Sequence, residues 1–378
     1  MHRLLTLLFV LPLLALSGGA LASASALIDL DSRQTILAEN PNGTVNVSGM
    51  LPLMAVYTAL DQIERGRSPV QLFEMVDGPW PGRDGADARV PFAELLEGLL
   101  MTGDPKAADA VLAALKLTPE DFDARMRESA EGLGLRHTTF SYPCGAKGAC
   151  TGTALETAEI AMALYDRFGV SRVWGGSRSS TLSNGTELVN RNLFLPKSPA
   201  ISGIYAAPEG PGGTASGVIL SENPKGTKNR LRRMLAVVLN AGDSDAMQEL
   251  VSSLMLRGYR DYDTIELYGE GAVVASIPVY KSESATVPAA VARRTFITIT
   301  NEQMLTQGSE AFELRVRYAS PLIAPIEEKA PVGELEVRVS GKPIAVVPLV
   351  AAKAVSEGGF WARLRDTVRL ALDRDTLH

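Results

Sequence analysis

The chain has 378 residues, of which 46% are apolar, so it is long enough for two domains that each bury a core. Its formal charge is −6, and no stretch is rich in both basic and aromatic residues. This composition disfavours nucleic-acid binding, because nothing supplies the concentrated positive charge that phosphates require.

The first 22 residues are typical of a signal peptide. Residues 1–3 form a short basic start, residues 4–16 form an apolar run, and residues 20–22 (Ala-Leu-Ala) offer a cleavage site. The apolar run is too short for a comfortable membrane span, and an uncleaved anchor is the alternative. We expect the mature chain to start near Ser23, outside the cytoplasm.

The stretch after residue 46 predicts a loop that leads into a buried helix. Ser48 is placed to cap the first turn with its hydroxyl group, and Pro52 is tolerated near a helix start because its missing N–H costs little there. Apolar residues then repeat at helical spacing over residues 53–64, and Gly66 supplies the stop.

Further elements up to residue 262 mix strands and helices. Residues 26–31 and 35–38 predict a hairpin. Capping residues and apolar spacing predict helices over residues 92–101, 106–115, 118–131, 154–168 and 243–256. Apolar runs predict strands over residues 201–205, 217–220 and 234–239. Such a mixture indicates an α/β or α+β layered domain.

From residue 263 the pattern changes to one of strands. Apolar and charged residues alternate over residues 312–318, and again over residues 334–339 before a Ser340-Gly341 turn. Alternation with a period of two indicates sheets with one solvent-facing side. We therefore expect a second domain, a small all-β sandwich, over residues 263–352.

The last segment, residues 353–378, ends in an amphipathic helix. Five apolar residues line one side of this helix: Trp361, Leu364, Val368, Ala371 and Leu372. We expect the helix to lie in a membrane interface, with Phe360 and Trp361 as anchors. Packing on its own domain or on a partner is the alternative, and the acidic end of the helix weakens its attraction to anionic lipid.

The only two cysteines, Cys144 and Cys150, share one glycine-rich loop. In an exported protein this spacing favours a local disulfide over a zinc site, since the spacing is not that of a zinc knuckle and His137 is the only nearby histidine. The same shortage of histidines leaves a Ser-His-Asp hydrolase poorly supported, because only His137 could act as its base. We expect no cofactor and no metal site.

Several short segments, taken in order, resemble the D-alanyl-D-alanine carboxypeptidases, the low-molecular-mass penicillin-binding proteins of bacteria. These segments are residues 27–29 (LID), 95–100 (LLEGLL), 132–140 (GLGLRHTTF), 190–192 (NRN), 203–204 (GI), 348–350 (PLV) and 357–360 (EGGF). The resemblance covers nearly the whole mature chain. It implies a serine-peptidase domain with the β-lactamase/transpeptidase-like fold over residues 23–262, the sandwich domain, and a membrane-associating C-terminal helix. It also implies a periplasmic protein that acts on peptidoglycan, held on the outer face of the inner membrane.

The family reaction is acyl transfer from a stem peptide of peptidoglycan. In that family, a serine that opens a helix attacks the penultimate D-Ala carbonyl, and a lysine one helical turn later takes its proton. A Ser-x-Asn triplet assists proton transfer, and a Lys-Thr-Gly strand binds the substrate carboxylate and helps to form the oxyanion site.

All three motifs differ in this chain. The first has two alternative registers, and neither contains a lysine: Gly49 with Pro52, or Ser48 with Leu51. The second motif places Thr102 and Asp104 where the family has serine and asparagine, so that a carboxylate replaces an amide. The third replaces Lys-Thr-Gly with Tyr205, Ala206 and Ala207, the residues expected to line the substrate site. A lysine from elsewhere, such as Lys106 or Lys197, is the remaining candidate for a base.

Three hypotheses for the function remain open. The first is a catalytically inactive homologue that binds a stem peptide or an envelope protein, with a ligand held between Tyr205 and Asp104. The second is a slow serine D,D-carboxypeptidase that uses Ser48 as its nucleophile. The third places the protein's role in the sandwich domain and the C-terminal helix, as an interaction module on the membrane.

Overall fold

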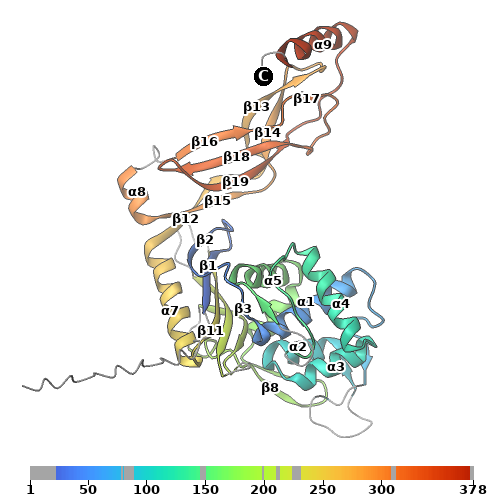
Figure 1. Cartoon of the computed structure of the whole chain (residues 1–378), viewed down its shortest axis with the longest axis vertical. Helices are drawn as coiled ribbons and strands as arrows, with labels where there is room; N and C mark the ends of the chain where they lie inside the picture. The colour runs from blue at the N-terminus through green and yellow to red at the C-terminus, as the bar shows by residue number, and fades with distance from the viewer. Residues whose placement is uncertain are drawn as a thin grey trace, which may run out of the picture.

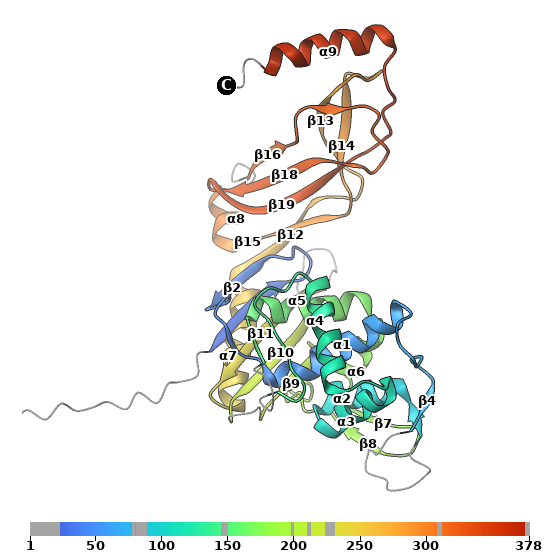
Figure 2. The ribbon, with the colours of Figure 1, turned by 45° about the vertical axis from the view of Figure 1, so that its right-hand side comes forward.

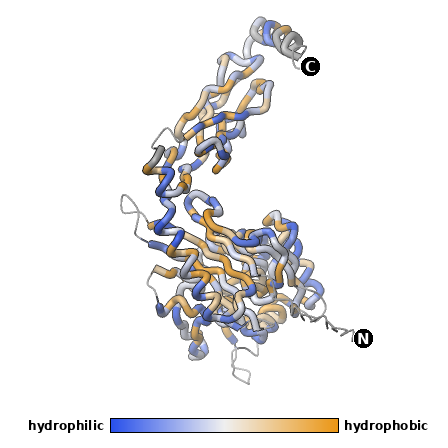
Figure 3. Tube along the Cα trace, turned by 60° about the vertical axis from the view of Figure 1, so that its left-hand side comes forward, coloured by the Kyte–Doolittle hydropathy of each residue, from blue (hydrophilic) through white to orange (hydrophobic). Residues whose placement is uncertain are grey.

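The computed structural model describes residues 23–77, 80, 89–144, 150–197, 200–209, 213–223, 231–307 and 312–374. The predicted signal peptide, residues 1–22, lies outside the described residues. The molecule is elongated, with a mixed α/β domain at one end, a β-rich domain beyond it and helix α9 at the far end (Figures 1 and 2). Figure 3 shows the apolar stretches gathered in the middle of the α/β domain.

A five-stranded antiparallel sheet with the strand order β2-β1-β11-β10-β9 forms the centre of the α/β domain. Its strands are β1 (Ala24–Asp29), β2 (Thr35–Glu39), β9 (Ile201–Ala207), β10 (Ala215–Asn223) and β11 (Arg232–Ala241). Strands β1 and β2 form the predicted hairpin. Helix α7 (Ser244–Asp261) covers one face and α5 (Ala154–Arg167) covers the other (Figure 1), so the central strands are almost entirely buried.

The remaining helices lie on the α5 side of this sheet (Figure 1). They are η1 (Ser48–Met50), α1 (Leu51–Glu64), α2 (Phe92–Thr102), α3 (Pro105–Leu115), α4 (Pro119–Gly132) and α6 (Gly169–Gly176). The domain also contains three short strand pairs, with two or three residues in each strand. They are β3 (Val45–Asn46) with β6 (Thr151–Gly152), β4 (Met75–Val76) with β5 (Val90–Pro91), and β7 (Ser179–Thr181) with β8 (Glu187–Val189). The predicted helices are confirmed, whereas α6 and the short strand pairs were not predicted, since they are too short to show a period.

The β-rich domain consists of two sheets around one core. Its elements are β12 (Tyr262–Tyr268), β13 (Val273–Tyr280), β14 (Thr286–Val291), β15 (Thr295–Thr300), α8 (Asn301–Gln307), β16 (Phe312–Arg317), β17 (Leu322–Ile323), β18 (Pro331–Val339) and β19 (Lys342–Ala351). Strands β12 and β15 form one sheet, and the other six form the second. Ile297 of β15 packs in the same core as Leu335 and Val337 of β18, as predicted for a sandwich. Helix α8 is an addition to the predicted all-β domain.

Helix α9 (Phe360–Arg374) turns its apolar side away from the rest of the chain. Trp361 is 78% exposed, and Phe360, Leu364 and Val368 are exposed as well. The helix is held instead by Asp366, which is buried and accepts a hydrogen bond of 2.7 Å from the main-chain N–H of Lys281. The helix therefore contacts the β-rich domain through a polar side chain, while the four apolar side chains named above are exposed. Among the described residues, no helix is long and apolar enough to span a bilayer.

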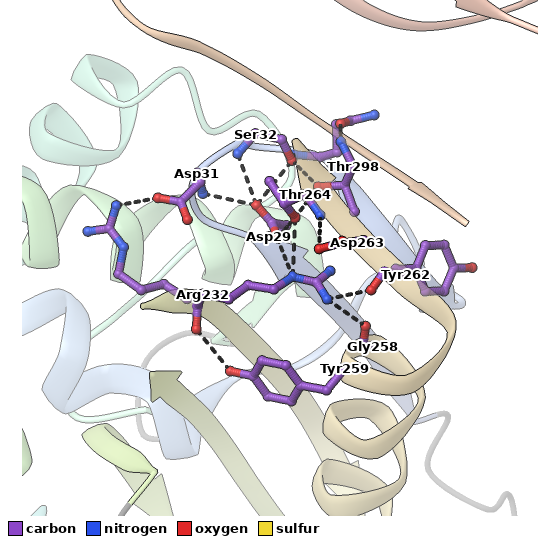
Figure 4. Close-up of polar contacts among 12 residues, drawn as sticks. Asp29, Asp31, Ser32, Arg232, Gly258, Tyr259, Tyr262, Asp263, Thr264 and Thr298 are labelled. Atoms are coloured by element: carbon purple, nitrogen blue, oxygen red, sulfur yellow. Dashed lines mark hydrogen bonds and ion pairs between the residues drawn. The ribbon is translucent and has the colours of Figure 1, made fainter. Parts of the chain in front are cut away.

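A network of buried polar groups joins the two domains (Figure 4). Asp29, at the end of β1, is fully buried and lies 3.4 Å from Nε of the buried Arg232. The same carboxylate accepts hydrogen bonds from the main-chain N–H of Ser32 (3.0 Å) and from the hydroxyl of Thr264 in β12 (2.5 Å). The hydroxyl of Thr298 in β15 lies 3.0 Å from that of Thr264. Side chains of both domains thus share one buried carboxylate.

Candidate active site

The turn before α1 places Ser48 and Gly49 at the edge of the sheet. The hydroxyl of Ser48 donates to Oδ1 of Asn46 at 2.6 Å, and its main-chain N–H donates to the same oxygen at 2.8 Å. Helix α1 begins three residues later, and its N-cap residue, Met50, makes no side-chain capping bond. The prediction that Ser48 caps the helix is therefore wrong, because the short η1 turn separates the serine from α1 and the amide of Asn46 binds its hydroxyl.

Gly49 faces the strands that carry the third motif. A Cβ atom added at Gly49 would lie 3.3 Å from Cβ of Ala207 in β9 and 3.9 Å from Cβ of Ser216 in β10. A small side chain at this position would therefore point along the edge where Tyr205 and Ala207 lie. The hydroxyl of Ser48, by contrast, is directed to Asn46.

A cleft of about 480 Å³ opens beside these residues. Seventeen described residues line it: Ser48, Gly49, Leu51, Pro52, Ala55, Leu99, Gly103, Asp104, Pro105, Ala108, Tyr142, Pro143, Cys144, Arg191, Tyr205, Ala207 and Glu209. The structure thus brings together most of the residues that the sequence singled out, from three motifs that are far apart in the chain. Thr102, Ala206 and Cys150 are not among the residues lining the cleft.

Thr102 and Asp104 both bind other parts of the protein. The hydroxyl of Thr102 donates to the main-chain oxygen of Gly98 at 2.7 Å, one turn back in α2. Asp104 caps α3, since Oδ1 accepts from the N–H of Lys106 at 2.9 Å, and its Oδ2 accepts from Nε1 of Trp80 at 2.8 Å. A carboxylate is well suited to capping a helix N-terminus. Asp104 therefore has a structural role at the cleft wall.

Tyr205 reaches across from β9 to the turn between α2 and α3. A Cβ atom added at Gly103 would lie 2.6 Å from the phenolic oxygen, so the hydroxyl packs directly against the backbone there. Gly103 also has φ = +62°, which favours glycine. Burial raises the pKa of Tyr205, and the positive charge of Arg191 opposes this shift only in part. A neutral, buried phenol therefore fills the space between the second and third motifs.

Ala206 and the two candidate lysines lie away from the cleft. Because side chains alternate along a strand, Ala206 points to the opposite face of the sheet, where it packs with Val251 of α7. Lys106 is exposed on α3 and does not line the cleft. Lys197 donates to Oε1 of Gln248, beside α7. None of the described residues that line the cleft is a lysine.

The wall opposite β9 is held by the predicted disulfide. Cys144 and Cys150 are bonded, with an S–S distance of 2.02 Å. The main-chain oxygen of Cys150 accepts a 3.0 Å hydrogen bond from the N–H of Val47, so Cys150 is tied to the segment that leads into η1. The hydroxyl of Tyr142 donates to Asp109, and burial together with this carboxylate raises the pKa of Tyr142.

His137 does not belong to the cleft. Its Nδ1 lies 3.0 Å from Oε1 of Glu156, and its ring is exposed. Burial alone would raise the pKa of Glu156, but hydrogen bonds from Thr138, Arg136 and His137 lower it. Within the described part of the chain, no three histidine, cysteine, aspartate or glutamate side chains gather closely enough to hold a metal ion.

Two charged residues of the cleft were not predicted from the sequence. Arg191 lies within the Asn-Arg-Asn segment that carried part of the resemblance, and it was not assigned a role. Its main-chain N–H donates to the oxygen of Met101 (2.9 Å) and its Nη1 to that of Thr102 (3.2 Å), which brings it to the cleft. Glu209 follows β9 and gave no local signal, because isolated acidic residues are common in loops.

Comparisons with known proteins agree on one group. The profile described as "Penicillin-binding protein 5, C-terminal domain" matches residues 262–357. The D-alanyl-D-alanine carboxypeptidase DacF of Bacillus subtilis is 21% identical over 92% of this chain and 89% of its own length. The D-alanyl-D-alanine carboxypeptidase DacA of Escherichia coli is 22% identical over 92% of this chain and 87% of its own.

The fold is also that of a solved structure in this group. Penicillin-binding protein 5 from Haemophilus influenzae superposes with a TM-score of 0.71 at 19% sequence identity. The superposition covers 88% of this chain and 97% of that one, so it includes both domains.

Proposed function

The chain belongs to the family of the D-alanyl-D-alanine carboxypeptidases, the low-molecular-mass penicillin-binding proteins, and we propose that it is a catalytically inactive member with a binding or regulatory role. The family acts on the stem peptides of peptidoglycan. This member keeps a cleft large enough for a short peptide, and it retains the fold that builds that cleft.

The observation that carries the proposal is the position of Tyr205. The phenol occupies the space between β9 and Gly103, where the related family has the lysine of its third motif, and no described lysine lines the cleft. Loss of a single transition-state donor reduces the rate by roughly two to three orders of magnitude. Loss of the base and of the carboxylate-binding cation together leaves little rate enhancement, even though such effects are not additive.

We further propose that Gly49 and Pro52 occupy the positions of the nucleophile and the base. Gly49 supports this register because its missing side chain would point at Ala207, along the third motif. Ser48 lines the cleft, but its hydroxyl is directed to Asn46. In this register the chain has neither a hydroxyl to attack a carbonyl nor an amine to take its proton.

A penicillin-labelling experiment tests the inactivity. The purified mature protein is incubated with a fluorescent penicillin, and adducts are detected by intact mass. We expect no adduct on the wild-type protein or on Ser48→Ala. A stoichiometric adduct on Ser48 that is lost in Ser48→Ala would refute the proposal and establish the slow serine enzyme instead.

A matched pair of variants tests the register, in a Tyr205→Lys background that restores a cation to the third motif. One variant carries Leu51→Lys, which supplies an amine to Ser48, and the other carries Gly49→Ser with Pro52→Lys. We expect penicillin labelling only from the second. Labelling of the Leu51→Lys variant alone would assign the nucleophile position to Ser48.

We also propose that the protein is exported to the periplasm and contacts the outer face of the inner membrane through α9. The exposed apolar side of this helix, which includes Trp361 and Phe360, lies at the end of the molecule farthest from the α/β domain (Figure 2). Aromatic side chains are favoured at the headgroup level of a bilayer. Co-sedimentation with lipid vesicles should fall strongly in the Phe360→Ser, Trp361→Ser double variant, and it should persist in Leu305→Ser, which removes an exposed apolar side chain from α8. Equal binding of all three proteins would contradict the assignment.

A further inference from the structure

The charges that line the cleft differ in sign from those that a carboxylate ligand requires. Among the described residues that line it, Asp104 and Glu209 are acidic and Arg191 is basic, so their formal charges sum to −1. The hydrogen bonds that Asp104 accepts from Trp80 and from the N–H of Lys106 satisfy its oxygens, but they do not remove its charge.

Arg191, the one basic residue in the described part of the cleft lining, is partly committed to the protein. Nη1 of Arg191 donates to the main-chain oxygen of Thr102 at 3.2 Å, which holds the guanidinium beside the turn between α2 and α3. Tyr205 adds no positive charge, and its buried phenol stays neutral because burial raises its pKa. Among the described residues, a free carboxylate entering this cleft would therefore meet one basic group and two acidic groups.

Apolar side chains form a large part of the remaining cleft wall. Leu51, Pro52, Leu99 and Ala207 face the same space as the charged groups. Short aliphatic side chains fit such a wall, since their burial is favourable and leaves no polar atom without a partner. The ligand that these surfaces complement has small apolar groups next to a positive or neutral end.

From these features we propose that the cleft takes an aliphatic peptide segment that carries a positive charge, or a capped end, in place of a free carboxylate. This inference rests on the proposed function, because it assumes that the cleft still binds a peptide. It reverses the charge preference that the related family's Lys-Thr-Gly motif provides. The exposed Glu209 supplies the negative charge nearest to solvent, and Asp104 supplies the negative charge at the wall of the cleft.

Four peptides test the preference by titration calorimetry at low salt. All have the backbone acetyl-L-lysyl-D-alanyl-D-alanine, with a free carboxylate or a terminal amide, and with a free or an acetylated lysine side chain. We expect the amide with free lysine to bind tightest and the acid with acetylated lysine to bind weakest. Each change of one charge should alter the Kd by about three- to tenfold, as for charges separated by several ångströms near a protein surface. At 1 M salt, where the screening length is about 3 Å, the ratios should approach one.

Single substitutions test which residues set the preference for a ligand without a free carboxylate. Glu209→Gln should reduce the preference for the amide over the acid, whereas Glu187→Gln, at an exposed position on β8 outside the cleft, should leave it unchanged. Both substitutions lie on the surface, so neither is expected to disturb folding. Tyr205→Lys should shift the preference toward the peptides with a free carboxylate, because the lysine supplies a positive charge that attracts it.

The possible results distinguish a failure of this inference from a failure of the proposed function. Tighter binding of the acid than of the amide, or an unchanged preference in Glu209→Gln, would overturn the charge preference and leave an inactive peptide-binding protein. Failure of all four peptides to bind would overturn both the inference and the binding role. Neither result would bear on catalytic inactivity, which the penicillin experiment measures separately.

Discussion

The domain junction and the cleft both contain charged side chains, but these have different partners. At the junction, Asp29 and Arg232 bind each other, and Nη1 of Arg232 also donates to the main-chain oxygens of Gly258 and Tyr262. Every partner belongs to the same chain, so these charged groups hold the two domains in their arrangement (Figure 4). At the cleft, Arg191 and Glu209 face an open space of about 480 Å³ and are available to a ligand.

Burial, rather than residue type, therefore distinguishes a charged group with a structural role from one that is available to a ligand. Asp29 is 0% exposed, and an uncompensated charge there would be costly, whereas Glu209 is exposed and costs nothing to leave unpaired. Asp104 combines the two roles, because it lines the cleft while its oxygens accept hydrogen bonds from Trp80 and from the start of α3. Four predictions, in order of decreasing effect, test the contacts at the junction and at the cleft.

The largest effect is expected at the junction. Asp29→Ala leaves Arg232 buried without its carboxylate, so we expect the free energy of unfolding to fall by about 3–5 kcal/mol in urea titrations. The matched control is Asp166→Ala, which removes the partner of Arg33 where both side chains are 43% exposed. This control should cost less than about 1 kcal/mol. Equal losses in the two variants would show that the junction pair does not hold the domains.

The disulfide beside the cleft should have an intermediate effect. Replacing both cysteines, Cys144→Ser with Cys150→Ser, removes a cross-link between residues separated by six positions. Because the entropy of closing so short a loop is small, we expect a loss of about 2 kcal/mol in the free energy of unfolding. The reduced wild-type protein should match the variant. A loss more than twice as large would show that the bond also maintains the wall formed by Tyr142.

The buried phenol of the cleft predicts a pH dependence. Because the pKa of Tyr205 is raised above its ordinary value of 10.0, its contribution is fully present below pH 10 and is lost as the pH rises further. Between pH 9 and pH 11 the wild-type protein should lose about 1 kcal/mol more stability than Tyr205→Phe. Tyr318→Phe, at an exposed position, serves as the control and should follow the wild type. Parallel curves for wild type and Tyr205→Phe would contradict the burial of the phenol.

The smallest effect is expected at Ser48. Its hydroxyl donates to the exposed Asn46 and caps no helix, so Ser48→Ala should change the free energy of unfolding by less than about 0.5 kcal/mol. A loss of 1 kcal/mol or more, measured by urea unfolding, would restore the capping role that the sequence predicted.

Local sequence patterns predicted much of the secondary structure. The period of apolar residues and the capping signals predicted the hairpin, the longer helices, the central strands of the first domain and two strands of the second, because these features depend on residues close together in the chain. Thr118 and Asp121, for example, form the predicted cap of α4 with no help from distant residues. The sequence also assigned the family and the pairing of the only two cysteines.

Which side chains share a site depends on the packing of distant parts of the chain, so local patterns do not predict it. The sequence predicted Ser48 as a cap, but its hydroxyl binds Asn46 instead. Arg191 is held at the cleft by its main-chain N–H, which donates to Met101, and by its Nη1, which donates to Thr102. Asp29 and Arg232 are separated by 203 positions, so no local pattern could pair them. The choice between Ser48 and Gly49 likewise depends on the direction of a Cα–Cβ bond relative to β9, which is set by the packing of the helix on the sheet.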